Sequence, residues 1–255
     1  MIEGFTVIIP ARFASSRLPG KPLRLLGGRP MIEHVHRRAV ESGAQRVVVA
    51  TDDRRIAEAC DAFGAQCLLT SVEHASGTDR VAEAAARLGL APEAVVVNLQ
   101  GDEPLMPPEL LRIAAQSLED APVATLALPI EDPAEVASPH AVKVVLNARG
   151  HALYFSRAAI PFDRDAFGAD GHPGEHFEPA GDYLRHLGIY AYRAEFLARY
   201  RRLSASPLER RESLEQLRVL WAGEPIRVAV VEQRPPPGVD IEEDLTRAER
   251  WLGVR

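Results

Sequence analysis

Three cationic side chains lie close together in the sequence PARFASSRLPGK: Arg12, Arg17 and Lys21. Guanidinium forks and an ammonium group match phosphate oxygens, and Ser15, Ser16 and Gly20 allow a ligand close access to the backbone. The loop follows a compact apolar run at 5–9, and ligands of open parallel sheets bind beyond the carboxyl ends of the strands. The pattern predicts a triphosphate cradle. A basic surface loop is the alternative.

Two familiar nucleotide-binding loops do not fit this segment. A P-loop needs Ser or Thr after its Gly-Lys pair to hold Mg²⁺, whereas here Gly20 and Lys21 are followed by Pro22. No Gly-x-Gly-x-x-Gly pattern follows the first apolar run, which disfavours a dinucleotide cofactor. Any metal ligand must therefore come from elsewhere in the chain.

Two aspartates are candidates for that ligand. Asp102 follows the apolar run at 94–100 through Gly101, where the chain can turn, and Asp240 follows a proline-rich turn after the run at 226–232. Carboxylates at the carboxyl end of a sheet can hold Mg²⁺ against phosphates, so we expect both to meet around one ion. Each could instead cap the helix that follows it. The motif Asp163-Arg-Asp165 resembles a glycosyltransferase D-x-D pattern, but it is short and common.

The elements that must position these residues alternate in type. Strands are expected at 5–9, 46–51, 66–69 and 94–100, and helices at 30–42, 53–63 and 79–88. Strands that are apolar on both faces and separated by helices indicate βαβ units. The predicted fold class is therefore α/β, with a doubly wound, mostly parallel, Rossmann-like sheet.

The pattern changes after residue 130, which predicts a single domain over 1–255 with an inserted, hairpin-bearing lobe at about 131–192. The hairpin is expected at 141–155. The glycine-rich segment 163–182, which carries His172 and His176, is expected to be a solvated, mobile loop. Further along, the pattern predicts a strand at 185–193, a long helix at 207–222, a strand at 226–232 and a last helix at 241–252.

Bulk composition excludes several classes of protein. The chain has 255 residues and a net charge of -6, with no basic stripe of the kind that duplex nucleic acid requires. Two cysteines cannot build a disulfide framework, and there is neither a secretory signal nor an apolar run long enough to span a membrane. We expect a cytoplasmic, soluble protein that binds small molecules, without nucleic-acid or membrane partners.

The opening IIPARFASSRLPGKP (8–22) closely resembles that of the CMP-Kdo synthetases, the 3-deoxy-manno-octulosonate cytidylyltransferases. The likeness continues, in order, through VATD (49–52), HASGTDR (74–80), NLQGDEP (98–104), AVKVV (141–145), ALYFSRA (152–158), IPFDR (160–164), RHLGIY (185–190), SPLE (206–209), LEQLRVLW (214–221) and GVD (238–240). It covers essentially the whole chain. The resemblance implies a nucleotidyltransferase fold and a homodimer built partly through the inserted lobe.

The resemblance also implies roles for individual residues. Catalysis would involve Lys21, Arg12, Arg17 and Asp102, with Mg²⁺ held by Asp102 and Asp240. The nucleotide would contact Ala11, Arg12, Ser16, Arg17, Lys21, Ser76, Thr78 and Arg80. The sugar would contact Gln100, Arg157, Arg164, His186, Tyr190, Glu215 and Gln216. From residue patterns alone, His186 and Tyr190 would be packing residues, and Glu215 and Gln216 an exposed helix face.

The reaction implied is attack by the anomeric hydroxyl of 3-deoxy-manno-octulosonate (Kdo) on the α-phosphorus of CTP, which forms CMP-Kdo for lipopolysaccharide biosynthesis and releases pyrophosphate. Arg157 is the natural partner of the sugar carboxylate. Three alternatives remain: another sugar acid such as amino-Kdo or sialic acid, a glycosyltransferase, or a non-catalytic nucleotide-binding protein. Paired Asp102 and Asp240 speak against the last, because a sensor needs no metal at the α-phosphate.

Overall fold

The computed structural model describes residues 4–14, 17–74, 76–168, 171, 173–174, 177–179 and 181–253. The chain forms two compact units, each built from separate segments. Unit 1 comprises Met1–Gln116, Ile189–Arg202 and Pro235–Arg255, and unit 2 comprises Ser117–Gly188 and Leu203–Arg234. The lobe expected at about 131–192 overlaps unit 2, and its part in dimerisation stays a prediction.

Unit 1 is built on a parallel sheet. Its strands are β1 (Phe5–Ala11), β4 (Arg46–Thr51), β5 (Gln66–Leu69) and β6 (Val95–Asn98), in the order β6-β1-β4-β5. The second half of β10 (Leu184–Arg193) runs antiparallel to β6, with Tyr190 opposite Asn98. β1 lies between β4 and β6 and is buried from Thr6 to Ala11, as its unbroken apolar sequence predicts.

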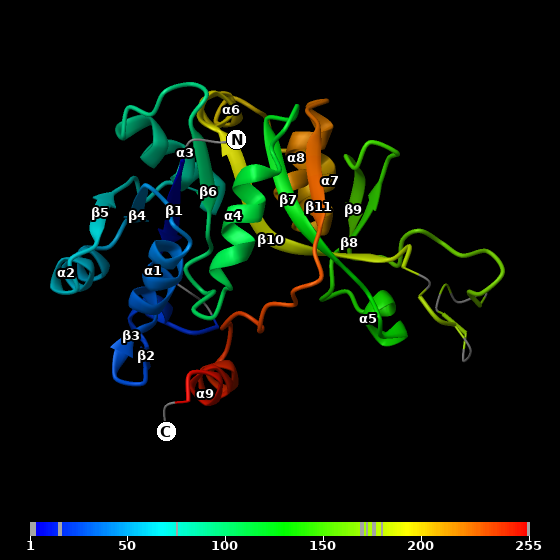
Figure 1. The fold of residues 1–255 in the computed structure, drawn as a ribbon, viewed down its shortest axis with the longest axis horizontal. Coiled ribbons are helices and arrows are strands. Elements are labelled where there is room, and N and C mark those ends of the chain that lie inside the picture. The colour runs from blue at the N-terminus through cyan, green and yellow to red at the C-terminus, as the bar shows by residue number, and fades with distance from the viewer. Residues whose placement is uncertain are drawn as a thin grey trace. The chain divides into compact units, whose positions relative to one another are not determined.

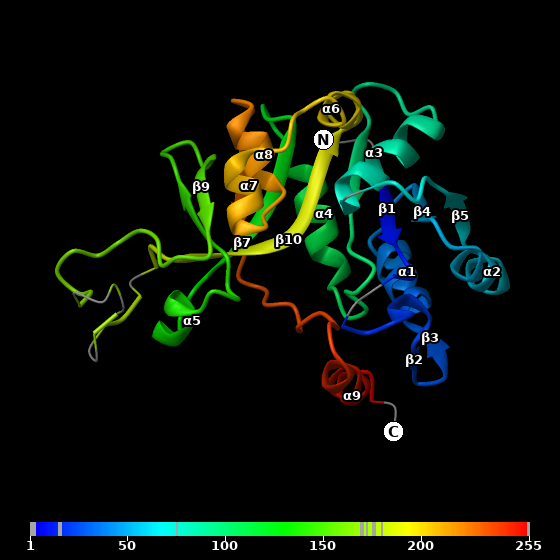
Figure 2. The same ribbon diagram turned by 180° about the vertical axis from the view of Figure 1, so that it is seen from behind.

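Helices cover both faces of this sheet (Figures 1 and 2). On one face lie α1 (Met31–Glu41), α2 (Arg54–Ala62) and α4 (Pro108–Gln116); His36 of α1 and Phe63 at the end of α2 are in ring contact at 5.5 Å. On the other face α3 (Gly77–Arg87) packs against α6 (Ala194–Tyr200). A 3-10 turn, η1 (Lys21–Leu23), the short strands β2 (Leu25–Leu26) and β3 (Arg29–Pro30), and α9 (Glu242–Trp251) complete the unit. The α/β fold with a mostly parallel, doubly wound sheet is confirmed.

Unit 2 combines a parallel strand pair with a hairpin. β7 (Val123–Pro129) pairs with β11 (Ile226–Val230), and β8 (Lys143–Leu146) pairs antiparallel with β9 (Ala152–Ser156), as predicted. β8 also pairs with the first residues of β10. Three short helices, α5 (Pro133–Ala137), α7 (Pro207–Glu212) and α8 (Gln216–Trp221), belong to this unit. No helix in the described part of the chain combines the length and apolarity needed to cross a bilayer.

Two expectations for unit 2 are wrong. The helix predicted at 207–222 is broken into α7 and α8 at Ser213, which adopts φ 53° and ψ 49° in the left-handed region. The segment 163–182 is not simply a solvated loop, because Phe167 and Phe177 are buried and pack against Tyr183, with ring centroids 6.3 and 5.3 Å from it. Aromatic burial anchors this segment despite its glycines. His172 and His176 lie outside the described residues.

Candidate functional site

A backbone hydrogen bond joins the two ends of the loop after β1. The Gly20 N–H donates to the Phe13 carbonyl at 3.2 Å, and the Arg55 guanidinium lies 3.4 Å from the centre of the Phe13 ring. Gly20 has φ 66°, and a Cβ there would lie 3.1 Å from the same ring, so glycine is required. Arg12 is exposed and forms no hydrogen bond or ion pair with any other described residue. Ser16 lies outside the described residues.

Lys21 begins η1, and its ammonium group is surrounded by oxygen atoms. Its Nζ donates to Asp102 Oδ2 at 2.8 Å, to Asp240 Oδ1 at 3.0 Å and to the Val239 carbonyl at 3.0 Å. Burial by itself would lower the pKa of Lys21, but the charges and hydrogen bonds of the two carboxylates outweigh it and raise the pKa above its ordinary value. Lys21 therefore stays an ammonium ion throughout the physiological range.

Backbone packing brings the two aspartates together. The Val239 N–H donates to the Asp102 carbonyl at 2.8 Å, so the segment carrying Asp240 lies along the loop after β6. Gly238 permits this approach, because a Cβ there would lie 2.9 Å from the Glu103 carboxylate. Gly101 lets the loop after β6 lie against β1, because a Cβ there would lie 2.9 Å from the Pro10 carbonyl. Each of the two aspartates has an oxygen within 3.0 Å of Lys21 Nζ, so these oxygens are at most about 6 Å apart.

Neither aspartate caps a helix. Asp102 lies six residues before α4, and the residue preceding α9 is Ile241, so the capping alternative fails for both. The Asp244 carboxylate instead accepts the N–H groups of Asp240 and Ile241, at 2.9 and 3.1 Å. Arg17 reaches the free side of Asp240, with Nη1 3.1 Å from Oδ2. Lys21, Asp102 and Asp240 therefore lie together, and Arg17 contacts the same Asp240.

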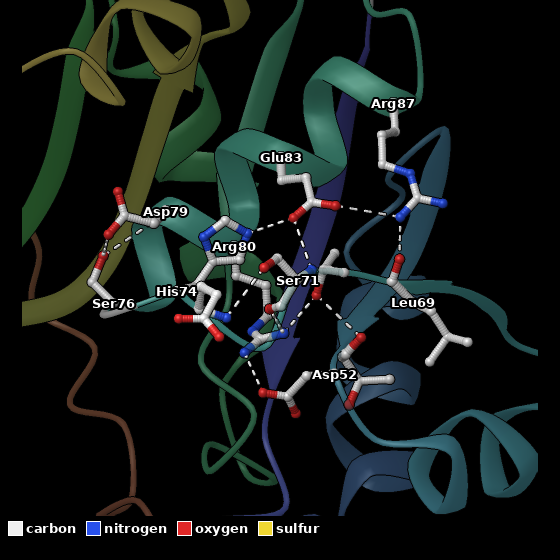
Figure 3. Close-up of polar contacts among 12 residues, drawn as sticks. Asp52, Leu69, Ser71, His74, Ser76, Asp79, Arg80, Glu83 and Arg87 are labelled. Carbon is white, nitrogen blue, oxygen red and sulfur yellow. Dashed lines mark hydrogen bonds and ion pairs between the residues drawn. The ribbon is translucent and has the colours of Figure 1, made fainter.

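The start of α3 is held by internal contacts (Figure 3). Ser76 is its N-cap: Oγ accepts the Asp79 N–H at 3.1 Å and donates to Asp79 Oδ2 at 2.8 Å. Thr78, the second residue of the helix, is buried. Gly77 lies against the other loops, since a Cβ there would be 3.5 Å from the Gln100 amide and 3.6 Å from the Pro10 ring. The end of β1, the loop after β6 and the start of α3 thus meet.

Arg80 is buried and forms hydrogen bonds with residues of two loops. Only 3% of its surface is exposed; Nη2 donates to Asp52 at 2.6 Å and Nη1 to Thr70 Oγ1 at 2.5 Å. Both partners lie in the loops that follow β4 and β5, so the guanidinium ties those loops to α3 (Figure 3). Any contact between Arg80 and a nucleotide would have to share these hydrogen bonds.

Glu83, which the sequence did not single out, secures the same loop. Its carboxylate accepts the Ser71 N–H at 3.0 Å, lies 2.5 Å from His74 Nε2, and pairs with Arg87 (Figure 3). Burial would raise the pKa of Glu83, but these hydrogen bonds lower it overall. The segment between β5 and α3 is therefore fixed at two points along its length.

The predicted sugar residues divide between the units, with Gln100 and Tyr190 in unit 1. Gln100 donates to Asn98 Oδ1 at 3.4 Å, while the buried Asn98 Nδ2 has no partner among the described residues. Tyr190 is buried and stacks on Tyr192 at 5.8 Å. An unsatisfied buried donor beside Gln100 is a position where a polar ligand atom would be stabilised.

In unit 2, Arg157 follows β9 and is held by neutral groups. Its Nε donates to the Glu212 carbonyl at 2.7 Å and its Nη1 to the Pro139 carbonyl at 2.9 Å. No carboxylate of the described residues forms an ion pair with this guanidinium. Arg164 is exposed and has no partner among those residues.

The remaining sugar candidates of unit 2 lie on β10 and at the start of α8. His186 Nε2 is 3.0 Å from Thr125 Oγ1 and its ring packs edge-on against Phe155; burial of the imidazole lowers its pKa to about 3. Glu215 immediately precedes α8. Gln216 is 7% exposed and its Nε2 has no partner among the described residues, so the exposed-face interpretation is wrong for Gln216.

The candidate metal ligands in the described part of the chain are a pair of carboxylates rather than a larger cluster. Within the described ranges, no three His, Cys, Asp or Glu side chains gather as a metal cluster would require. The pair Asp102 and Asp240, with the Val239 carbonyl, surrounds a position that holds a cation, the Lys21 ammonium group. One or two carboxylates suffice for Mg²⁺ when phosphates complete its coordination.

Comparison with known proteins identifies the family. A cytidylyltransferase family model matches residues 6–226. A 3-deoxy-manno-octulosonate cytidylyltransferase of Halorhodospira halophila is 58% identical over 97% of this chain and 96% of the relative, and one of Idiomarina loihiensis is 56% identical over 98% of both. The solved structure of a CMP:2-keto-3-deoxy-manno-octonic acid synthetase complexed with CTP matches with a TM-score of 0.87 and 43% identity, covering 98% of this chain and 99% of that one. The chain belongs to the 3-deoxy-manno-octulosonate cytidylyltransferase family.

Proposed function

We propose that the chain transfers CMP from CTP to the anomeric hydroxyl of Kdo, forming CMP-Kdo and pyrophosphate. The family supports this reaction, and the observation that carries it is the convergence of Lys21, Asp102 and Asp240 beyond the carboxyl ends of β1 and β6. Sheets of this class bind nucleotides at that edge. We place the reaction in lipopolysaccharide biosynthesis, in a cytoplasmic homodimer.

Phosphate binding falls to the cationic loop. Arg12 is exposed without a partner among the described residues, and Arg17 reaches only the outer side of Asp240, so both can turn to phosphate oxygens at little cost. Lys21 is fixed more firmly, by three hydrogen bonds to the two carboxylates and the Val239 carbonyl. Preorganised cations of this kind stabilise the charge that develops on departing pyrophosphate.

The oxygen atoms around Lys21 fit Mg²⁺. Asp102 and Asp240 would hold the ion; both are hard oxygen ligands and are already arranged around a positive charge. When bound, Mg²⁺ supplies charge neutralisation at the phosphates and lowers the pKa of the attacking hydroxyl. Lys21 would then be released from the two carboxylates and could donate to a phosphate oxygen instead.

The acidic sugar is matched by groups in unit 2. Arg157 carries a charge that no neighbouring carboxylate of the described residues neutralises, and its guanidinium keeps donors beyond the two bound to carbonyls. Gln216 adds a buried amide that lacks a partner among those residues. A carboxylate and a hydroxyl of Kdo would satisfy these groups. Related sugar acids share the carboxylate, but the named relatives favour Kdo.

A pyrophosphate-release assay tests the proposal. We would combine CTP, UTP, ATP and GTP with Kdo, amino-Kdo and sialic acid, with Asp102→Asn as the inactive control. Turnover should be strong only with CTP and Kdo and should require Mg²⁺. Equal turnover of ATP and CTP would exclude the cytidylyltransferase assignment. Faster turnover of another sugar acid would exclude Kdo as the substrate.

A further inference from the structure

Arg157 is fixed at four points, more than a side chain that only packs would need. Besides the two guanidinium bonds to the carbonyls of Glu212 and Pro139, its backbone N–H donates to Glu212 Oε2 at 3.0 Å, and its carbonyl accepts from Lys143 Nζ at 2.7 Å. Both the backbone and the side chain are therefore held. Such fixation keeps a guanidinium fork ready to bind a planar anion.

Glu212 supplies two of these four bonds without neutralising the guanidinium. One carboxylate oxygen accepts the Ser156 hydroxyl at 2.7 Å and the other accepts the Arg157 backbone N–H, while the guanidinium donates only to the backbone carbonyl of Glu212. A carboxylate placed directly against the guanidinium would compete with an anionic ligand. The observed arrangement holds Arg157 in place and leaves its charge available.

Lys143 contributes the fourth bond, to the backbone carbonyl of Arg157. It is fully buried, and its ammonium group donates to three carbonyl oxygens, those of Ser138, Ala141 and Arg157, at 2.6 to 2.7 Å. No carboxylate of the described residues contacts it. The Ser138–Ala141 turn fixed by Lys143 includes Pro139, whose carbonyl accepts from Arg157 Nη1.

Glu212 also connects Arg157 to the second candidate sugar segment. It is the last residue of α7, directly before the left-handed Ser213 that turns the chain toward Glu215 and Gln216. Fixing Glu212 to the end of β9 therefore fixes where α8 begins. One side chain thus secures two groups proposed to contact the sugar.

We infer that Glu212 is a positioning residue for the acid substrate, acting through Arg157, which it holds ready to bind the substrate carboxylate. This inference rests on the proposed function, in which Arg157 receives that carboxylate. A purely structural role for Glu212 would affect both substrates alike. A positioning role affects the sugar alone and depends on Arg157.

The test is a double-mutant cycle on the full-length protein, with KM measured separately for Kdo and CTP. Arg157→Ala and Glu212→Ala should each raise the KM for Kdo by roughly 10- to 100-fold while changing the KM for CTP by less than about threefold. In the Arg157→Ala background, Glu212→Ala should add almost nothing, because the group it positions is absent.

The conservative variant Glu212→Gln should rescue Kdo binding to within about threefold of wild type. Its amide oxygen can still accept the Arg157 N–H, and its amide nitrogen can donate to Ser156 Oγ. Glu209→Gln is the matched control: Glu209 lies one turn earlier on α7 and binds Arg218 at 2.5 and 2.9 Å, away from Arg157. It should lower the melting temperature without separating the two KM values.

The outcomes separate the inference from the proposed function. If Arg157→Ala leaves the KM for Kdo unchanged, the carboxylate receptor is misassigned, and the inference falls with it. If Arg157→Ala raises that KM but Glu212→Ala does not, or acts additively, the positioning role is wrong and the receptor stands. Should Glu212→Ala fail to fold, Ser156→Ala replaces it. Ser156→Ala should raise the KM for Kdo about two- to fivefold, by removal of one hydrogen bond, and equal changes in both KM values would exclude positioning.

Discussion

Lys21 and Lys143 are both largely removed from solvent, but their surroundings differ in kind. Lys21, in unit 1, contacts two carboxylates, and these raise its pKa above the ordinary value. Lys143, in unit 2, contacts only carbonyl oxygens, and burial lowers its pKa to about 8. One cation is neutralised by its neighbours and the other is not.

The difference follows the ligand proposed for each unit. In the proposed function, unit 1 binds a triphosphate with Mg²⁺, which brings charges of both signs, and its own carboxylates and cations pair with one another. Unit 2 is proposed to bind a single carboxylate, and its cations, Lys143 and Arg157, are held by carbonyl dipoles rather than by ion pairs with carboxylates of the described residues. Carbonyl oxygens can hold a cation in position without supplying the negative charge that would oppose an anionic ligand.

The largest expected effect comes from removing the lysine that the two carboxylates of unit 1 surround. Lys21→Ala should lower kcat by roughly 10²–10³, the scale for losing one preorganised charge donor. The variant should still fold, because Lys21 lies beyond the end of β1 and outside the sheet. Arg37→Ala, which removes an exposed ion pair with Glu33 on α1, is the matched control and should stay within about twofold of wild type. Near-normal turnover of Lys21→Ala at saturating CTP would exclude the phosphate cradle.

Alkaline pH should separate the two lysines. The folded-state pKa of Lys143 lies below its unfolded value of 10.5, so the cost of burying its charge is present below pH 8 and disappears as pH rises toward 10.5. The free energy of unfolding of wild type minus that of Lys143→Met should rise by about 1–2 kcal/mol between pH 7.5 and 9.5. The same difference for Lys21→Met should stay flat, because the stabilisation by Lys21 persists until pH exceeds 10.5.

Urea unfolding at both pH values measures these differences, and subtracting each variant cancels the titration of distant groups. Glu212, Arg157 and Glu135 are the charged residues acting on Lys143. A flat difference for Lys143→Met would mean that the three carbonyls hold the ammonium ion more strongly than burial disfavours it.

Acid pH should reveal a third buried group, with a similar or smaller effect. Burial lowers the pKa of His186 from 6.5 to about 3, so the neutral ring stabilises the fold above pH 6.5, and this contribution is lost as pH falls toward 3. Relative to His186→Asn, wild type should lose about 2 kcal/mol of unfolding free energy between pH 7 and pH 5. A normal titration of the His186 ring by NMR, near pH 6.5, would contradict this.

Most of the unit 1 fold could be predicted from the sequence, because its strands are unbroken apolar runs bounded by helical patterns. β1, β4, β5 and β6 lie where expected. The sequence patterns predicted no element at α4, α6 or β7. The run of buried residues in β7, VATLALP, has no alternation, and an apolar run of that length suits a buried helix or a buried strand equally.

The site was predictable where chain position alone determines it. Asp102 and Asp240 both follow strands of one sheet, and the structure brings them to a single lysine. The roles of Arg80 and Glu212 could not be read from their neighbours in sequence, because Arg80 binds Asp52 and Glu212 binds Arg157 only after folding. The break at Ser213 could not be predicted for the same reason. Arg218 of α8 pairs with Glu209 of α7 only after folding, and this ion pair holds α8 against α7.

The segmented construction of the two units sets an order for synthesis on the ribosome. Lys21 and Asp102 emerge early, but Asp240 lies in the last segment of unit 1 and is translated only after all of unit 2, which ends at Arg234. Domains fold as their chains become available, so unit 2 can fold before unit 1 is complete. Until Asp240 is translated, Lys21 has at most one of its two carboxylate partners, so the proposed phosphate and metal site is among the last parts of the molecule to be completed.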